Sequence, residues 1–441
     1  MKKSSTPTKW HKLDNTANIF PVVASRRMAN VFRLTAVLRD EVEPALLQTA
    51  LEETLPYFAA FNVRLRHGLF WNYFETNRAT PHIHPEEDPP CQYLNGMETD
   101  RFLFRVLYFQ RRIHLETFHA LTDGTGAIRF LRAVCYRYFQ LRSPEHFTKE
   151  QLTVPYGVEH ASNIEDGYLK NYVPAKSATF REPTAFHIRA EKREAPGVAV
   201  TTALMPTAEL KDLCHRSGAS VGEYLTAALG FAVYEEYTRS NGATRPINIF
   251  VPVNLRRIFP SNTSTNFFSN ITVALPMHGP DIPFEDVLDN VHVQFKEKCS
   301  RDVLAKKLAY TSRSENNIFA RISPLPLKCG ILRIVFERSS NGSTTAFSNL
   351  GPVEVDPLFA PFFEGFRVLL MPTPKEPCKV SSISCGNTVT LTFASELEDD
   401  ALARNVVRRL TAQGVSVVIE SSESSGNVEA AERSVIADEA L

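Results

Sequence analysis

The sequence between residues 113 and 139 changes from one hydrophobic pattern to another within a single short turn. Ile113 to Phe118 is predicted to be a strand, and Gly124 to about Phe139 has the spacing of a helix. The turn between them is His119-Ala120-Leu121-Thr122-Asp123. A histidine therefore follows directly on a strand, and an acid stands where a helix begins. We expect this turn to hold the histidine ring in a fixed direction.

The chain is too long for one compact core, because such cores stop growing near ~250 to 300 residues and this chain has 441. Residues 156–197 show little periodicity and several proline and charge breaks, and the order of elements beyond them resembles that of the first half. We therefore predict four segments. They are a first domain at 1–175, a connecting segment at 176–197, a second domain at 198–420, and a disordered tail at 421–441 that is rich in Ser, Glu and Ala.

Local patterns predict the elements of the second half. Ser220 and Glu223 have the spacing of a capping box, so a helix begins there. Alternating apolar residues from Ile247 to Val253 predict a strand that ends near Asn254. A helix is predicted from Pro283 to Phe295 and another at 398–413. Further strands are predicted at 198–205, 268–275, 330–337, 344–349, 366–371, 388–394 and 415–419.

Charge and composition exclude several classes of protein. Lys plus Arg and Asp plus Glu each number 49, and no basic stripe is interleaved with aromatic residues, which argues against a nucleic-acid partner. No apolar run reaches the ~18 residues of a membrane span, and no apolar segment follows Lys2 and Lys3 as in a signal peptide. The seven cysteines form no Cys-x-x-Cys pair, so we expect reduced thiols. Together these features favour a cytoplasmic enzyme.

His119 is the candidate catalytic residue. A histidine can accept a proton and return it near neutral pH, which suits a general base that acts first on one substrate and then on another. The alternative is a loop histidine that bonds a backbone carbonyl. Asp123 has two compatible interpretations, a helix N-cap or an ion pair with a distant arginine that braces the loop. Gly124, without a Cβ, leaves room for a substrate chain to pass close.

His119-x-x-x-Asp123-Gly124 resembles the His-His-x-x-x-Asp-Gly motif of the chloramphenicol-acetyltransferase-like superfamily. That superfamily includes alcohol acetyltransferases, wax ester synthases and condensation domains of peptide synthetases. Phe118 replaces the first histidine here. In the family the second histidine is the catalytic one, so the replacement is tolerable, although it makes a condensation domain a weaker match.

Two segments of the second half extend the resemblance. Ser348-Asn349-Leu350-Gly351-Pro352 is similar to the Ser-Asn-x-x-Gly-Pro segment of wax ester synthases but is one residue shorter. Val251-Pro252-Val253-Asn254-Leu255-Arg256 is similar to the Pro-Val-Asn-x-Arg strand end of bacterial alcohol acetyltransferases. The Asp-Phe-Gly-Trp-Gly motif of the plant branch is absent from the chain. The resemblance covers most of residues 20–420.

The resemblance implies a fold, a reaction and a set of site residues. The fold would be two chloramphenicol-acetyltransferase-like α/β domains, with mixed sheets and flanking helices, that form a pseudo-dimer around a central tunnel. The reaction would transfer an acyl group from acyl-CoA, a co-substrate, to an alcohol or amine through a ternary complex, without a bound cofactor or metal, in a monomer. His119 would be the base and Asp123 a structural acid, and the residues in contact with substrate would be Gly124, Asn254, Arg256, Ser348 and Asn349.

Individual roles within that set have alternatives. Arg256 is the candidate partner of Asp123, against a surface arginine. Ser348 or Asn349 is the candidate donor to the oxyanion of the tetrahedral intermediate, against a β-turn, and Asn254 is a weaker candidate. His82-Ile83-His84 with nearby acids lacks a spaced third metal ligand, so we expect no metal site there.

Two other functions remain open at this point. One is an acyltransferase or condensation enzyme that takes its donor from an acyl carrier protein rather than from free acyl-CoA. The other is a non-catalytic binding protein of the same fold, which the replacement at Phe118 allows. Neither the acyl chain nor the acceptor is identified by these residues, because one fold serves many substrates.

Overall fold

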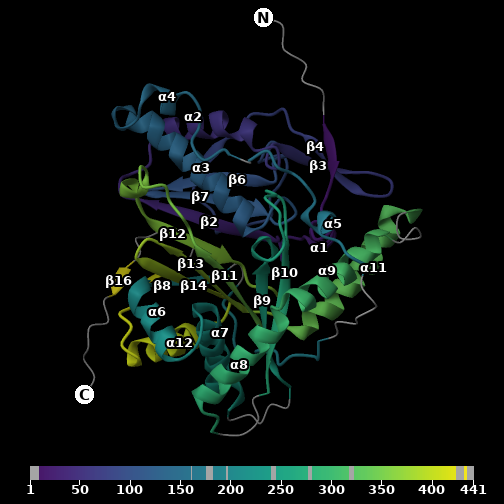
Figure 1. Cartoon of the computed structure of the whole chain (residues 1–441), viewed down its shortest axis with the longest axis vertical. Coiled ribbons are helices and arrows are strands. Elements are labelled where there is room, and N and C mark those ends of the chain that lie inside the picture. Colours follow the sequence, from purple (N-terminus) through teal and green to yellow (C-terminus); the bar gives the residue numbers. More distant parts are fainter. Residues whose placement is uncertain are drawn as a thin grey trace, which may run out of the picture.

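The computed structural model of the chain describes residues 9–159, 161–174, 182–194, 197–239, 245–276, 281–316, 322–423 and 432–434. They form two lobes, each built on a sheet with helices packed against it (Figure 1). A third, smaller sheet lies beside the first lobe. Most of the predicted tail at 421–441 and part of the predicted connecting segment at 176–197 lie outside the described residues.

The sheet of the first lobe has five strands in the order β12-β2-β7-β6-β5. Only the β5–β6 pair is parallel among them. Helices α2 and α3 pack against each other and cover one face of this sheet (Figure 1). The bounds are β2 Val31–Leu38, α2 Pro44–Thr54, β5 Ile83–Pro85, β6 Phe104–Phe109, β7 Arg112–Phe118, α3 Gly124–Arg142 and β12 Phe363–Leu370.

The sheet of the second lobe has eight strands in the order β10-β9-β11-β13-β14-β8-β15-β16. It is mixed, because β11 runs parallel to both β9 and β13 while the other pairs are antiparallel. The bounds are β8 Ala199–Pro206, β9 Ile247–Asn254, β10 Phe268–Leu275, β11 Thr345–Pro352, β13 Cys378–Cys385, β14 Thr388–Ser395, β15 Val418–Glu423 and β16 Glu432–Ser434.

Helix α7 is the central helix of the second core. It begins where the sequence predicts, since Ser220 Oγ accepts from Glu223 N–H and the Glu223 carboxylate accepts from Ser220 N–H at 2.7 Å. All of its residues from Glu223 to Val233 are buried. The helices of this lobe are α6 Thr207–Arg216, α7 Val221–Val233, α8 Phe284–Lys298, α9 Arg301–Asn316, α11 Leu325–Ser339 and α12 Ala401–Ala412.

The two lobes are not separate along the chain. Strand β12 comes from the C-terminal half, yet it pairs antiparallel with β2 in the first sheet, with Phe366 opposite Ala36. The strand that follows it, β13, returns to the second sheet. This exchange ties the lobes together next to the region where their sheets meet. The predicted segment boundaries at 175 and 198 stay predictions.

The strand predicted at 330–337 is wrong, because these residues lie within helix α11. The run Ile331-Leu332-Arg333-Ile334-Val335-Phe336 is apolar and β-branched, which suits a buried strand by pattern alone. The correct element follows from Pro324 at the N-cap and from neighbours that are distant in sequence, such as Leu69, whose carbonyl accepts from Leu325 N–H.

A small three-stranded sheet, in the order β1-β4-β3, lies at the edge of the first lobe. β1 (Trp10–Lys12) pairs with β4 (Asn72–Thr76), which forms a hairpin with β3 (Val63–His67). The tip of this hairpin lies beside the start of α11 (Figure 1). The remaining short helices are α1 Phe20–Val23, α4 Lys149–Leu152 and α5 Gly167–Lys170.

Candidate active site

His119 lies directly after β7, in the turn that leads to α3, as predicted. Its backbone N–H donates to the carbonyl of Asn30 at 2.8 Å. Its imidazole stacks on Phe20, with ring centroids 4.6 Å apart and planes 13° apart, and it also contacts the rings of Phe32 and Phe268. Phe268 begins β10 in the second lobe. Aromatic rings from both lobes therefore fix the direction of the imidazole.

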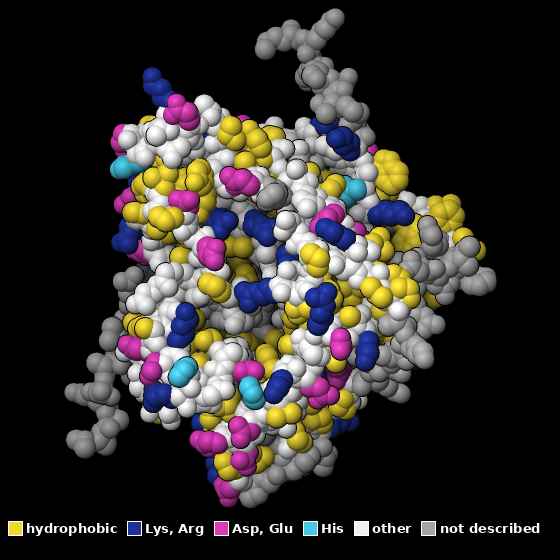
Figure 2. Space-filling model, viewed as in Figure 1, with side chains coloured by type: hydrophobic (Ala, Val, Ile, Leu, Met, Phe, Trp, Pro, Cys, Tyr) yellow, Lys and Arg dark blue, Asp and Glu magenta, His cyan; other side chains and the backbone are white. Residues whose placement is uncertain are grey.

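The His119 side chain lines a cavity of about 2220 Å³ between the lobes. Figure 2 shows a hollow near the centre of one face, with hydrophobic side chains on its floor and Lys or Arg side chains at its rim. The wall includes Asp123 and Gly124 from the first lobe. It also includes Asn254, Ser348 and Asn349 from the second lobe. All the predicted site residues except Arg256 therefore line the same cavity as His119.

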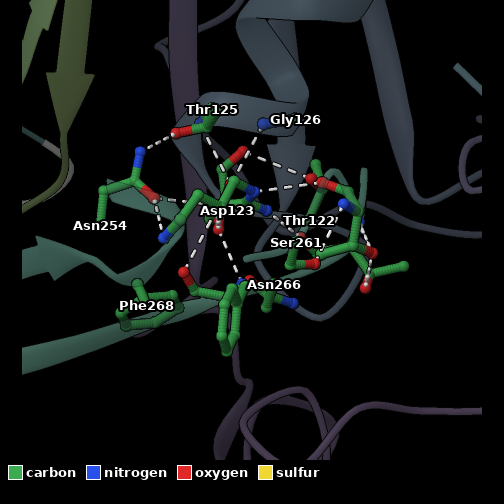
Figure 3. Close-up of polar contacts among 12 residues, drawn as sticks. Thr122, Asp123, Thr125, Gly126, Asn254, Ser261, Asn266 and Phe268 are labelled. Atoms are coloured by element: carbon green, nitrogen blue, oxygen red, sulfur yellow. Dashed lines mark hydrogen bonds and ion pairs between the residues drawn. The ribbon is translucent and has the colours of Figure 1, made fainter. Parts of the chain in front are cut away.

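Asp123 caps α3 and at the same time pairs with Arg256 (Figure 3). Its Oδ1 accepts from the N–H groups of Thr125 and Gly126, both at 3.1 Å. Its Oδ2 accepts from Arg256 Nη1 at 2.7 Å and from the N–H of Phe267 at 2.9 Å. Both interactions that the sequence suggested for Asp123 are present. Because its oxygens are occupied in this way, Asp123 is placed to brace the turn.

The side chain of Arg256 is almost completely buried. Besides Asp123, its guanidinium donates to the carbonyls of Thr263 at 3.1 Å and Thr265 at 2.5 Å. It lies in the turn after β9, where Asn254 Oδ1 accepts from Arg256 N–H at 3.0 Å. The arginine therefore ties the His119 turn to residues 261–268, and it is not the surface residue of the alternative interpretation.

Asn266 is a site residue that the sequence analysis missed. Its Nδ2 donates to the backbone carbonyl of His119 at 3.1 Å and lies 3.2 Å from Asp14 Oδ2. The side chain of Thr122 donates to the carbonyl of Ser264 at 2.6 Å (Figure 3). No local pattern in the sequence distinguishes these residues, because each acts on a partner more than 140 positions away.

The two second-lobe segments meet at one sheet edge. β9 and β11 are parallel neighbours that pair through residues 249–250 and 345–346, and Asn254 and Ser348-Asn349 follow these pairs in the direction of the carboxyl ends. Asn254 Nδ2 donates to Thr125 Oγ1 at 3.0 Å, and Asn349 Oδ1 accepts from Gly351 N–H at 2.9 Å. The Ser348-Asn349 segment belongs to β11, whose pairing with β13 is irregular between Asn349 and Pro352, rather than to a separate β-turn.

Two glycines at the start of α3 differ in how tightly they are packed. A Cβ at Gly124 would lie 3.1 Å from Cδ2 of Leu350, a side chain on the cavity wall. A Cβ at Gly126 would overlap Thr122 Oγ1 and the backbone carbonyl of Ser264. The nearest neighbour of Gly124 is thus a movable side chain, and the passage of a substrate chain beside Gly124 stays a prediction. The requirement for glycine is stronger at Gly126, which the sequence analysis did not name.

Burial lowers the pKa of His119 below its usual value, and this outweighs the opposite effects of its own backbone and of the Asp123 charge. The pKa of Asp123 is also lowered, since Arg256 and two backbone N–H groups counter its burial. His119 Nδ1 is buried and has no hydrogen-bond partner among the described residues. The neutral imidazole is therefore favoured at neutral pH.

Within the described part of the chain, no three His, Cys, Asp or Glu side chains are grouped as a metal site. Near the His82-Ile83-His84 segment, Glu86 instead pairs with Arg33 and lies 3.2 Å from His114 Nε2. None of the described helices has the length and apolar character needed to cross a bilayer.

No family model and no curated protein matches this sequence. Solved structures do match. The starter condensation domain of rhizomide synthetase, as a mutant in complex with C8-CoA and Leu-SNAC, is 14% identical with a TM-score of 0.58, over 92% of this chain and 93% of that one. The trichothecene 15-O-acetyltransferase of Fusarium sporotrichioides is 11% identical with a TM-score of 0.58, over 93% and 96%.

Polyketide synthase associated protein 5 from Mycobacterium tuberculosis is 13% identical with a TM-score of 0.56, over 92% of this chain and 97% of that one. At these identities the likeness shows the fold alone. The chain has the two-lobed α/β fold of condensation domains and of this acetyltransferase, along nearly its whole length. The predicted fold class is confirmed.

Proposed function

We propose that the chain is an acyltransferase that moves an acyl group from acyl-CoA to an alcohol or amine, with His119 as the general base. The observation that carries this proposal is the imidazole of His119, held between aromatic rings on the wall of a cavity that both lobes line. A base placed between two lobes can meet two substrates that approach from different sides. The fold shared with an acetyltransferase and with a domain bound to C8-CoA supports the same reaction class.

In the proposed reaction, Nε2 of His119 accepts the proton of the acceptor hydroxyl while its oxygen attacks the thioester carbon. The new C–O bond yields a tetrahedral intermediate with a negative oxygen. Collapse of this intermediate breaks the C–S bond, and the imidazolium returns the proton to the departing thiolate. Because the thioester is already activated, the transfer needs no metal, no bound cofactor and no acyl-enzyme.

Ser348 and Asn349 are the proposed donors to the negative oxygen, a role worth ~3 kcal/mol in enzymes that form such intermediates. Both line the cavity on the wall that comes from the second lobe, whereas His119 comes from the first. Asn254 is less suited, since its amide nitrogen already donates to Thr125. Gly124 and Arg256 support the site as a cavity wall and as a brace. We expect a cytoplasmic monomer.

A second candidate is a condensation-type enzyme whose donor is bound to a carrier protein. The similarity to two condensation domains over 92% or more of this chain supports this second candidate. Purified protein would be supplied with free acyl-CoA and a series of short and long alcohols and amines, and thiol release would be followed. Turnover supports the first candidate, and activity only with acyl carrier protein supports the second.

The role of His119 is tested with His119→Ala in the same assay. We expect kcat to fall by ~10² to 10⁴ because the base is removed. The matched control is His146→Ala. His146 is an exposed histidine just after the C-terminal end of α3, and its variant should keep full activity. An unchanged rate in His119→Ala would overturn the proposal, as would an acylated residue trapped with donor alone. Absence of turnover with every donor would favour a non-catalytic binding protein.

A further inference from the structure

Helix α11 is apolar on two opposite faces. Leu325, Cys329, Leu332 and Phe336 follow helical spacing and are half-buried against the protein. A second stripe, on the other side, has four large apolar residues that are each more than half exposed: Leu327, Ile331, Ile334 and Val335. Ile331, in the middle of the stripe, is 55% exposed. A stripe of large apolar side chains on an exposed helix face is typical of a surface that contacts a partner or a membrane.

The tip of the β3–β4 hairpin extends this stripe. Leu69 is 71% exposed, and Phe70 next to it is also exposed. The tip is fastened to α11, because the Leu69 carbonyl accepts from Leu325 N–H and the Phe70 carbonyl accepts from Lys328 Nζ, both at 2.9 Å. The helix and the hairpin tip therefore form one apolar surface, here termed the α11 edge, at one side of the molecule (Figures 1 and 2).

The two tryptophans of the chain lie beside this edge, Trp10 on β1 and Trp71 in the turn between β3 and β4. Trp10 on β1 is 67% exposed and packs edge to face on Tyr73. Trp71 follows the hairpin tip, and Lys328 Nζ lies 3.4 Å from the centre of its ring. Tryptophans at the border between an apolar surface and water, beside cations, are typical of proteins that sit at a membrane surface.

The charges beside the α11 edge are mainly positive. Lys12 and Arg66 are exposed on strands of the small sheet, and Lys9 is exposed just before β1. The one acid on β3 and β4, Glu75, is held by Arg64 at 2.7 Å and lies 3.5 Å from Arg66. Exposed Leu, Ile and Phe side chains with a rim of Trp, Lys and Arg match a bilayer whose headgroups are anionic.

We propose that the α11 edge docks on an anionic lipid surface. The apolar stripe and the hairpin tip enter the boundary between headgroups and acyl chains, and the tryptophans and cations lie at headgroup level. The inner side of the same helix faces the cavity, since Arg333, Phe336 and Glu337 line it. Docking would place one wall of the cavity against the membrane. The proposal concerns this surface and goes beyond the proposed acyl transfer.

The test is sedimentation of the full-length protein with vesicles of phosphatidylcholine alone or with about one third phosphatidylglycerol. We expect binding to the anionic vesicles, weaker binding at high salt, and a blue shift of tryptophan fluorescence, because both tryptophans lie beside the edge. The double variants Leu69→Ser/Phe70→Ser and Ile331→Ser/Ile334→Ser should each weaken binding by about tenfold or more. Val293→Ser, at a 60% exposed position on α8, is the matched control.

Several outcomes would overturn the proposal. They are equal sedimentation with and without vesicles, binding that the double variants leave unchanged, and a dimer that the double variants abolish while vesicles have no effect. The last outcome would assign the edge to a second copy of this chain. Circular dichroism of each variant checks that the protein is folded. Because no acyl transfer is measured, a failure here leaves the proposed function untouched, and the reverse also holds.

Discussion

Arg256 Nη1 lies 2.7 Å from Asp123 Oδ2, and these two residues come from different lobes. The pair is nearly inaccessible to water, with 6% and 8% of the two side chains exposed. Each partner also forms hydrogen bonds with the backbone of its own lobe. Asp123 accepts from an N–H group at the start of α3, and Arg256 donates to the carbonyls of Thr263 and Thr265. The pair therefore fixes how the His119 turn sits against the second lobe.

Replacing Arg256 with Ala leaves the Asp123 carboxylate buried without its cation. We expect the free energy of unfolding to fall by about 3 to 5 kcal/mol and the activity to fall with it, because the His119 turn loses its brace. Arg216→Ala, which removes an exposed pair with Asp212, should cost less than about 1 kcal/mol. Denaturant unfolding and thiol-release rates measure both effects. An Arg256→Ala protein as stable and active as the parent would remove the bracing role.

The parts of this site that the sequence predicted are local ones. His119 and Asp123 occupy a turn whose flanking patterns are clear, and the Ser220–Glu223 capping box needs only four consecutive residues. Phe20, Phe268 and Asn266 escaped prediction because their roles depend on contacts with His119 from other parts of the chain. The residues next to a position in the sequence do not indicate such long-range contacts.

The same limit explains the misassigned strand and the exchange of β12. Residues 330–337 are apolar enough for a buried strand, but they continue a helix that begins after Pro324 and contacts the hairpin at Leu69. The strand predicted at 366–371 exists within β12, but its pattern does not say that its partner is β2 rather than a strand of its own half. Alternating side chains predict which face is buried and leave the partner open.

The two glycines at the start of α3 should respond differently to alanine. Gly126→Ala should destabilise the protein by about 1 to 3 kcal/mol, because its Cβ would overlap backbone at Ser264. At Gly124 the neighbour is the side chain of Leu350, which can move, and alanine favours a helix by roughly 0.5 to 1 kcal/mol. Gly124→Ala should therefore keep its stability and show a raised KM. Equal melting temperatures for the two variants would contradict this packing.

The pH dependence of the proposed reaction should reflect the lowered pKa of His119. Only the neutral imidazole can accept a proton, and burial keeps it neutral to a lower pH than in water. We expect kcat/KM to rise with pH through a midpoint below 6.5, the ordinary value, and to be level at neutral pH. Rates measured from about pH 5 to about 8 locate the midpoint. A midpoint above 6.5 would mean that another group controls the rate.

Asp14 should make the fold less stable as the pH rises. Its carboxyl is fully enclosed and close to Asn266, and burial raises its pKa from 3.8 to about 8. Between pH 3.8 and about pH 8, the folded protein keeps a proton on Asp14 that the unfolded chain has lost. The contribution of the protonated Asp14 to the free energy of unfolding is therefore complete below pH 3.8 and is lost as the pH rises to about 8. Asp14→Asn, which cannot ionise, should flatten this slope.

Thermal unfolding of the parent, Asp14→Asn and Asp212→Asn at several pH values from about 5 to about 8 measures this contribution. We expect the melting temperature of the parent to fall relative to that of Asp14→Asn as the pH increases. Asp212 is exposed on α6, so its variant should keep the slope of the parent. Parallel curves for the parent and Asp14→Asn would show that Asp14 is ionised in the folded protein. Its hydrogen bonds from Ala17 and Asn266 would then be bonds to a carboxylate.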